Sequence, residues 1–257
     1  MNISLKLALL PLLIFLSIIC GFLCAMFCQL DKATLIETVI NPELHFALRL
    51  SLSSSLLSLM LAIIIAIPPA WLMNQIKLPG QALIDTLLDL PMVLPPLVTG
   101  LGLLLLINPQ STLGTYIPTI RGLVFSPCGI VIAQTYVATA IMLRSARGAF
   151  STIDSGYRLA AYNLGLSPLI TLFKIEIPLC WRPLLCGVIL AWSRAIGEFG
   201  ATLMVAGATR LRTETLPIAI YLNISSGDFQ LAIGAALWLL VIAAFLLFIT
   251  RMISRQV

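Results

Sequence analysis

Long stretches without charge dominate the pattern of hydrophobic and polar positions along this chain. An α-helix rises 1.5 Å per residue, so crossing about 30 Å of hydrocarbon takes roughly 20 apolar residues. Uncharged stretches of that length recur along the sequence, and another is interrupted only by Arg194 and Glu198. We therefore predict a single all-α transmembrane domain over residues 1–257, with about six helices that span the membrane at 7–28, 46–73, 85–107, 124–147, 183–207 and 229–251.

Composition supports a membrane protein and excludes several other classes. The 257 residues are 60% hydrophobic and 10% charged, with a mean hydropathy of +1.08. A soluble domain carries about a quarter charged residues. We therefore exclude a soluble enzyme, a disordered chain and, despite a pI near 9.0, a nucleic-acid binder. The first apolar run, 7–27, exceeds the roughly 7–15 residues typical of a signal peptide, so we expect it to remain as the first span in membrane lipid.

The distribution of Lys and Arg between the loops predicts the orientation. Loops that face the cytoplasm carry the excess of basic residues. With the N-terminus inside, nine basic residues fall on the cytoplasmic side and five on the outer side. We expect a multi-pass protein of a bacterial or archaeal cell (inner) membrane, with both termini in the cytoplasm.

The third predicted span is interrupted by proline and glycine. Pro91, Pro95 and Pro96 are followed by Gly100 and Gly102, a density that breaks a helix. Broken backbone at membrane depth is tolerated only inside protein or beside a water-filled path. This segment is therefore a candidate pore wall, and a kinked packing helix is the alternative.

The fifth predicted span carries two charges inside the membrane. Arg194 and Glu198 are four residues apart, so on one helix they face the same side and can pair. Such charges normally face a bundle interior or an aqueous path. A gate charge and a structural ion pair are both compatible with the pattern. The candidate residues of a translocation pathway or gate are Pro95, Pro96, Thr99, Arg194, Glu198 and Thr202.

The long polar segment at about 148–178 predicts a hairpin of two short helices on the cytoplasmic side. Asp154 or Ser155 can cap the first helix, and Gly165 can end it in a left-handed turn. Ser167 can cap the second helix, with Pro168 in its first position. We expect Pro178 to close the second helix.

Motifs for chemistry within the chain are absent. The sequence has no GxxxxGK[ST] phosphate loop, no HExxH and no GxSxG. His45 is the only histidine, and none of the six cysteines has CxxC spacing. We therefore expect no catalytic residue, no metal site and no cofactor in this chain, which is not an enzyme by itself. A membrane-embedded enzyme or scaffold stays as a less favoured alternative.

The hairpin resembles the coupling loop of binding-protein-dependent ABC permeases. That family carries Glu-Ala-Ala, three residues, Gly, nine residues and Ile-x-Leu-Pro. This chain has Leu159-Ala160-Ala161, then Gly165, then Ile175-Glu176-Ile177-Pro178 at the same spacing. Leu159 replaces the family glutamate and removes its charge, and Ile177 replaces leucine conservatively. The resemblance implies a type I ABC importer permease fold, in which Leu159, Ala160, Ala161 and Gly165 belong to a coupling helix that docks on the ATPase subunit.

A second resemblance concerns the substrate. The stretches 194–207, with Gly197-Glu198-Phe199-Gly200, and 215–221 resemble the molybdate branch of these permeases. Ala208 departs from the asparagine usual in that branch. The resemblance implies import of a tetrahedral oxyanion, molybdate before sulfate or tungstate, whereas an ATP-independent secondary anion transporter is the rival mechanism. It also implies a homodimer of permeases, ABC ATPase subunits that hold ATP and magnesium, and an extracytoplasmic substrate-binding protein.

Overall fold

Helices make up the fold of this chain in a computed structural model, which describes residues 3–29, 32–117 and 122–254. Four helices within those ranges are long and apolar enough to cross a membrane: α1 (Ile3–Cys28), α3 (Pro42–Gln75), α7 (Pro127–Ser151) and α14 (Phe229–Ser254). The shorter helices are α2 (Lys32–Ile40), α4 (Gln81–Val93), α5 (Pro96–Ile107), α6 (Thr112–Tyr116), α8 (Ser155–Asn163), α9 (Pro168–Thr171), α10 (Ile177–Leu179), α11 (Trp181–Ile196), α12 (Gly200–Ala206) and α13 (Leu216–Ser226), together with the π-helix η2 (Leu172–Glu176).

Two bent pairs of helices account for the remaining candidate crossings. Helices α4 and α5 meet at 111°, and the helical segment Pro168–Leu179 meets α11 at 83°. Counting each pair as one crossing gives up to six among the described residues. The predicted span 85–107 is therefore an elbow and not one straight helix. Leu94 and Pro95 have extended backbone there, because Pro95 and Pro96 have no N–H to continue the helical hydrogen bonds.

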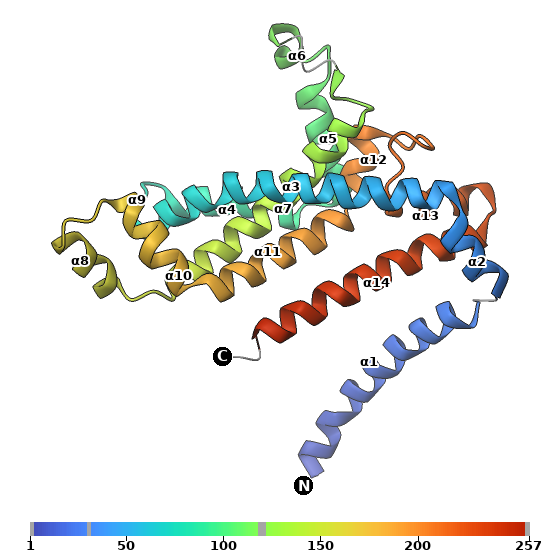
Figure 1. Cartoon of the computed structure of the whole chain (residues 1–257), viewed down its shortest axis with the longest axis horizontal. Coiled ribbons are helices and arrows are strands. Elements are labelled where there is room, and N and C mark those ends of the chain that lie inside the picture. Colours follow the sequence, from blue (N-terminus) through green and yellow to red (C-terminus); the bar gives the residue numbers. More distant parts are fainter. Residues whose placement is uncertain (1–2, 30–31, 118–121, 255–257) are drawn as a thin grey trace.

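The core lies where α3, α7 and α11 pack side by side (Figure 1). Alanines fill the contact between α3 and α7, and Ala62, Ala66, Ala138 and Ala146 are fully buried. Small side chains allow helix backbones to approach closely inside a membrane. The serines on α3 close polar gaps in this packing, since Ser51 Oγ accepts from Leu216 N at 2.8 Å and Ser58 Oγ donates to Val131 O at 3.1 Å.

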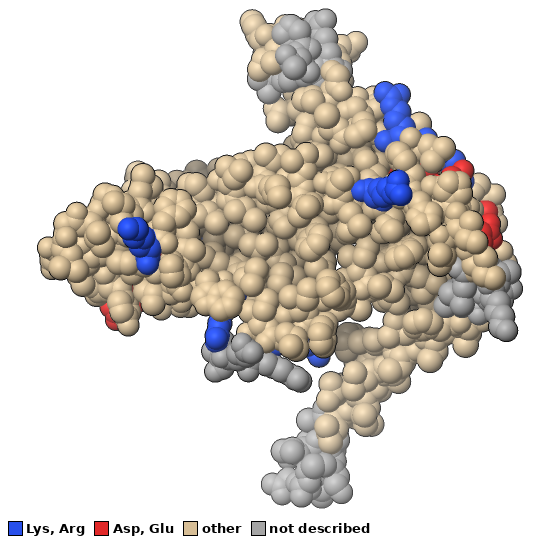
Figure 2. All heavy atoms as spheres, viewed as in Figure 1, with Lys and Arg blue, Asp and Glu red and all other residues tan. Residues whose placement is uncertain are grey.

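The two ends of this core carry different elements. Figure 1 shows α8 at one end of α3 and α2 and α13 at the other, while α5 and α6 project away from the core. Helix α1 stands apart, and no side chain within its apolar window is buried. Most of the face in Figure 2 has no charged side chain, which suits contact with lipid.

Candidate functional site

Local hydrogen bonds build the α8 hairpin as the sequence predicts. The Asp154 carboxylate accepts from Gly156 N at 2.6 Å and caps α8, and Ser167 Oγ accepts from Ile170 N at 3.4 Å and caps α9. Between them Gly165 adopts φ +79°, a left-handed conformation that glycine reaches without steric cost. The turn is therefore set by Asp154, Gly165 and Ser167.

The second helix ends at Leu179, one residue beyond the end at Pro178 that the sequence predicts. After Pro168 the chain stays helical through η2 and α10 to Leu179, and the bend falls at Cys180. In η2 the Ile177 N–H bonds to Leu172 O, five residues back. This π turn changes the hydrogen-bond register just before Pro178, so the missing N–H of the proline does not end the helix there.

A buried ion pair joins the two arms of the hairpin, and a hydrogen bond from α3 reaches the same carboxylate. Arg158 Nε lies 2.7 Å from Glu176 Oε1, and their side chains are only 13% and 1% exposed. Gln75 Nε2, at the end of α3, donates to the same oxygen at 3.1 Å. Sequence reasoning missed this network, although a carboxylate within the apolar Ile175–Pro178 string is a signal that a cationic partner must be near.

The exposed surface of the hairpin differs in part from the predicted one. Ala160 is exposed, and Leu159 and Leu164 expose 61% and 81% of their area. Ala161, expected on the docking face, is 2% exposed, because it lies three residues after Arg158 and shares its inward side of α8. The exposed apolar surface is instead formed by Tyr157, Leu159, Leu164, Leu169 and Phe173.

A cavity of about 470 Å³ gathers four of the predicted pathway residues. Pro95, Pro96 and Thr99 reach it from the elbow between α4 and α5, and Arg194 reaches it from α11. Val137 and Ile141 of α7 complete the wall opposite the elbow. The cavity is thus largely apolar, with one cationic side chain at its edge.

Arg194 pairs with Glu198, but not along one continuous helix. Helix α11 ends at Ile196, and Glu198 lies in the break before α12. Glu198 Oε1 accepts from Ala201 N at 2.9 Å, while Oε2 faces Arg194 Nη1. The Glu198 side chain is fully buried and that of Arg194 is 36% exposed. The carboxylate therefore fixes the break between the two helices and leaves the guanidinium toward the cavity.

Glycines let α5 cross α12 beneath the cavity. A Cβ on Gly100 would lie 2.7 Å from Ala201 Cα, and one on Gly200 would lie 2.7 Å from Pro96 Cβ. Thr99 and Thr202 are buried at this crossing, and their hydroxyls have no hydrogen-bond partner among the described residues. Thr202 belongs to this packing and is not among the residues that line the cavity.

The opposite end of the molecule carries a second polar network in the loop between α12 and α13. Arg210 contacts Glu43 and donates to Asn223 Oδ1 at 3.0 Å. Leu211 N donates to Glu214 Oε2 at 2.9 Å. Burial raises the pKa of the Glu214 carboxyl above its usual range. The backbone hydrogen bond from Leu211 lowers this pKa, the nearby charge of Glu43 raises it further, and the charge of Arg210 lowers it. The network closes this loop against the start of α3.

Residues 58–257 match the model of the family described as binding-protein-dependent transport system inner membrane component. The chain belongs to this family. It is accordingly a multi-pass membrane subunit of an ABC importer, a permease and not an ATPase.

Relatives include permeases named for molybdenum and for sulfate. YvgM of Bacillus subtilis, named as a molybdenum transport system permease, is 38% identical over 181 residues, 70% of this chain and 79% of the relative. The HVO_B0370 protein of Haloferax volcanii, named as a molybdenum ABC transporter permease, is 38% identical over 179 residues, 69% of this chain and 63% of the relative. The sulfate permease CysT of Salmonella typhimurium is 29% identical over 180 residues, 70% and 65% respectively. This chain thus spans less than two thirds of some relatives.

The fold is also shared with a solved importer. A bacterial ABC transporter that imports the acidic polysaccharide alginate matches with a TM-score of 0.76, over 98% of this chain and 95% of the other. The sequence identity is 16%, so this match supports the fold. The prediction of an all-α permease with a hairpin is confirmed.

Proposed function

We propose that this chain forms the membrane pathway of a molybdate importer. Its similarity to permeases named for molybdenum carries the proposal, at 38% identity to YvgM of Bacillus subtilis. The cavity beside the elbow supports it, since the partly exposed guanidinium of Arg194 offers hydrogen-bond donors to a dianion while the buried Glu198 carboxylate holds it from the other side. Similarity to a sulfate permease makes sulfate the second candidate, and tungstate shares the same charge and shape.

We infer that two copies of the chain enclose the pathway. Support comes from the extent of apolar surface left open, above all on α1 and on α5 with α6, which project from the core. Arg194, Pro95 and Pro96 of both copies would then border one path. Whether two copies assemble is measurable as the mass of the purified permease in detergent or nanodiscs.

We also infer that the exposed face of the hairpin docks on an ABC ATPase, which supplies ATP and magnesium. A helix with an apolar face binds in a groove of its partner, and Tyr157, Leu159 and Leu164 give α8 such a face. Ala160 lies on the accessible side, whereas Gly165 shapes the turn. In this arrangement the hairpin and both termini are cytoplasmic, and an extracytoplasmic binding protein delivers the anion to the α13 end.

ATP binding would drive transport by shifting the permease between its inward-facing and outward-facing states. Closure of the ATPase pair would pull the two hairpins together and favour the state that opens toward the binding protein. The buried Arg158–Glu176 pair joins α8 to η2, and Gln75 joins Glu176 to the end of α3, so these contacts would transmit that movement to α3.

The decisive experiment is reconstitution of the permease with its ATPase and its binding protein. ATP hydrolysis is measured with the binding protein loaded with molybdate, tungstate or sulfate. Strongest stimulation by molybdate supports the proposal, and stronger stimulation by sulfate replaces molybdate with sulfate. A permease that transports the anion in vesicles without any ATPase contradicts the importer mechanism and favours a secondary transporter centred on Arg194 and Glu198.

A further inference from the structure

A continuous crevice runs along α4 and shares Pro91 with the cavity that Arg194 lines. It consists of an apolar cavity of about 440 Å³ and a polar cavity of about 500 Å³, both between α4 and the α3–α7 pair. Leu88 and Leu143 line both cavities, which makes them neighbouring parts of one crevice. None of the predicted pathway residues Pro95, Pro96, Thr99, Arg194, Glu198 and Thr202 lines this space.

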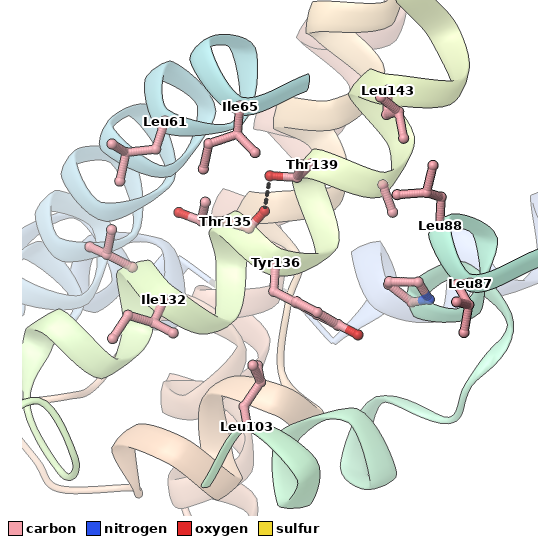
Figure 3. Close-up of a pocket in the computed structure, with 13 residues that line it drawn as sticks. Leu61, Ile65, Leu87, Leu88, Leu103, Ile132, Thr135, Tyr136, Thr139 and Leu143 are labelled. Atoms are coloured by element: carbon pink, nitrogen blue, oxygen red, sulfur yellow. Dashed lines mark hydrogen bonds between the residues drawn. The ribbon is translucent and has the colours of Figure 1, made fainter. Parts of the chain in front are cut away.

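The apolar part lies beside the membrane-spanning stretches of α3 and α7. Leu61 and Ile65 of α3 form one wall, and Figure 3 shows Tyr136 of α7 projecting toward the side of α4 and α5. Only the hydroxyls of Thr135, Tyr136 and Thr139 interrupt this surface. Such a space suits a hydrocarbon chain, because it holds no charge that would have to be desolvated.

The polar part has alternating charges at the hairpin end of the molecule. Arg147 binds both oxygens of Asp85, with Nη1 2.6 Å from Oδ1 and Nη2 3.3 Å from Oδ2. Arg144 makes no such close pair, since its Nη1 lies 3.9 Å from Asp89 Oδ2 and its side chain is 66% exposed. Arg144 therefore has donors free for a phosphate, and the half-exposed Asp89 beside it can accept from an ammonium group.

The crevice has the dimensions and polarity of one membrane leaflet. From Thr135 to Arg147, α7 rises about 18 Å at roughly 1.5 Å per residue. Half of a hydrocarbon core of about 30 Å is about 15 Å. The apolar part thus lies at the depth of acyl chains, and the charged part lies at the depth of headgroups on the hairpin side.

We propose that this crevice is a binding site for a phospholipid. One acyl chain lies against Leu61, Leu88 and Tyr136, and the phosphate binds Arg144. Basic pockets between transmembrane helices at the headgroup level bind lipid phosphates. Because Asp89 adjoins Arg144, the site favours a headgroup that also carries a primary ammonium, as phosphatidylethanolamine does, over phosphatidylglycerol. A soluble anion would leave the apolar part empty.

A bound lipid would brace α4. None of the described α4 side chains is buried, and this helix touches α7 mainly through the two ion pairs and the crevice wall. By filling the crevice, the lipid would hold α4 against α7. It would thereby also hold the Pro95–Pro96 elbow in position. The inference concerns this side of α4 and holds for any transported anion.

The test is native mass spectrometry of the purified permease after exchange into mixed phosphatidylethanolamine and phosphatidylglycerol nanodiscs. We expect the wild type to retain phosphatidylethanolamine, and Arg144→Gln to retain it about tenfold less, as loss of a charge-assisted hydrogen bond predicts. Leu88→Trp, which fills the shared wall, should also lose it. Arg251→Gln and Leu247→Trp on α14 are the matched controls and should retain it.

Three results would overturn the proposal. Equal lipid retention in wild type, Arg144→Gln and Leu88→Trp excludes the site. Preferential retention of phosphatidylglycerol excludes the assigned headgroup. Efficient cross-linking between two copies through Leu87→Cys, in a chain whose other cysteines are replaced, would show that a second permease and not a lipid covers the crevice.

Discussion

Gly165 is the residue at which backbone conformation alone limits substitution in the hairpin. At φ +79° a Cβ would meet no heavy atom within 4 Å, so the cost of a side chain is conformational and not steric contact. A β-branched residue is the least able to adopt this conformation, whereas asparagine tolerates it. The choice of substituent can therefore separate backbone shape from bulk.

We expect Gly165→Val to abolish stimulation of ATP hydrolysis by the loaded binding protein, while the protein still reaches the membrane. Gly165→Asn should keep most of that stimulation. Gly148→Ala is the control, since Gly148 lies in α7 without positive φ and with open space around its Cα. Stimulation of Gly165→Val at the wild-type level would contradict the role given to the hairpin.

Glu176 illustrates how one buried charge depends on its partner. Removal of one member of a buried ion pair leaves the other charge uncompensated, at a cost of about 3–5 kcal/mol. We expect Glu176→Leu to lower the free energy of unfolding by that order, because Arg158 loses its carboxylate. In scanning calorimetry of the detergent-solubilised protein, the Arg158→Leu/Glu176→Leu double variant should regain much of the lost stability.

The control for this effect is the exposed pair of Arg144 and Asp89, whose side chains are 66% and 47% exposed. Solvent screens such a pair, so Asp89→Asn should change stability by less than about 1 kcal/mol. If Glu176→Leu and Asp89→Asn shift the midpoint equally, the buried pair does not hold the two arms of the hairpin together.

At the scale of helices, the crossing of α5 and α12 depends on glycine. A methyl group on Gly100 would lie 2.7 Å from the backbone of Ala201. Gly102 lies about half a turn further along α5, and a Cβ there would meet no heavy atom within 4 Å. We expect Gly100→Ala to destabilise the protein by about 1–3 kcal/mol and to reduce transport, because α5 must move away from α12 beside the cavity. Gly102→Ala should leave both the midpoint of unfolding and transport unchanged.

At the same scale, the sequence predicts the local features of the site but not the way its helices pack. Prolines and glycines indicated a break in the third span and the left-handed turn at Gly165, because both effects act within a few residues. Contacts between segments that are distant in the sequence lie outside the reach of such local rules. The features that the sequence did not predict are the direction of the elbow, the π turn before Pro178 and the inward position of Ala161. Arg158 and Glu176, 18 positions apart, meet only when the hairpin folds.

At the scale of the whole molecule, hydropathy gave the class of protein but not the arrangement of its crossings. Within the residues that the structure describes, four helices satisfy length and apolarity alone, and the other two candidates are bent pairs. Hydropathy cannot distinguish a straight span from one bent by 111° or 83°, since both arms of each bent pair are apolar. The orientation prediction rests on basic residues in the loops, and it requires a measurement on the intact membrane.

Two exposed leucines at opposite ends allow that measurement in a chain whose native cysteines are replaced. Leu164 in the hairpin is 81% exposed and Leu211 in the α12–α13 loop is 55% exposed. We expect a membrane-impermeant maleimide to label Leu211→Cys in cells with a permeable or removed outer envelope. Leu164→Cys should react only after the cell membrane is opened, because positive loops stay in the cytoplasm. The reverse pattern would place the hairpin outside, out of reach of ATP, and would exclude its contact with an ATPase.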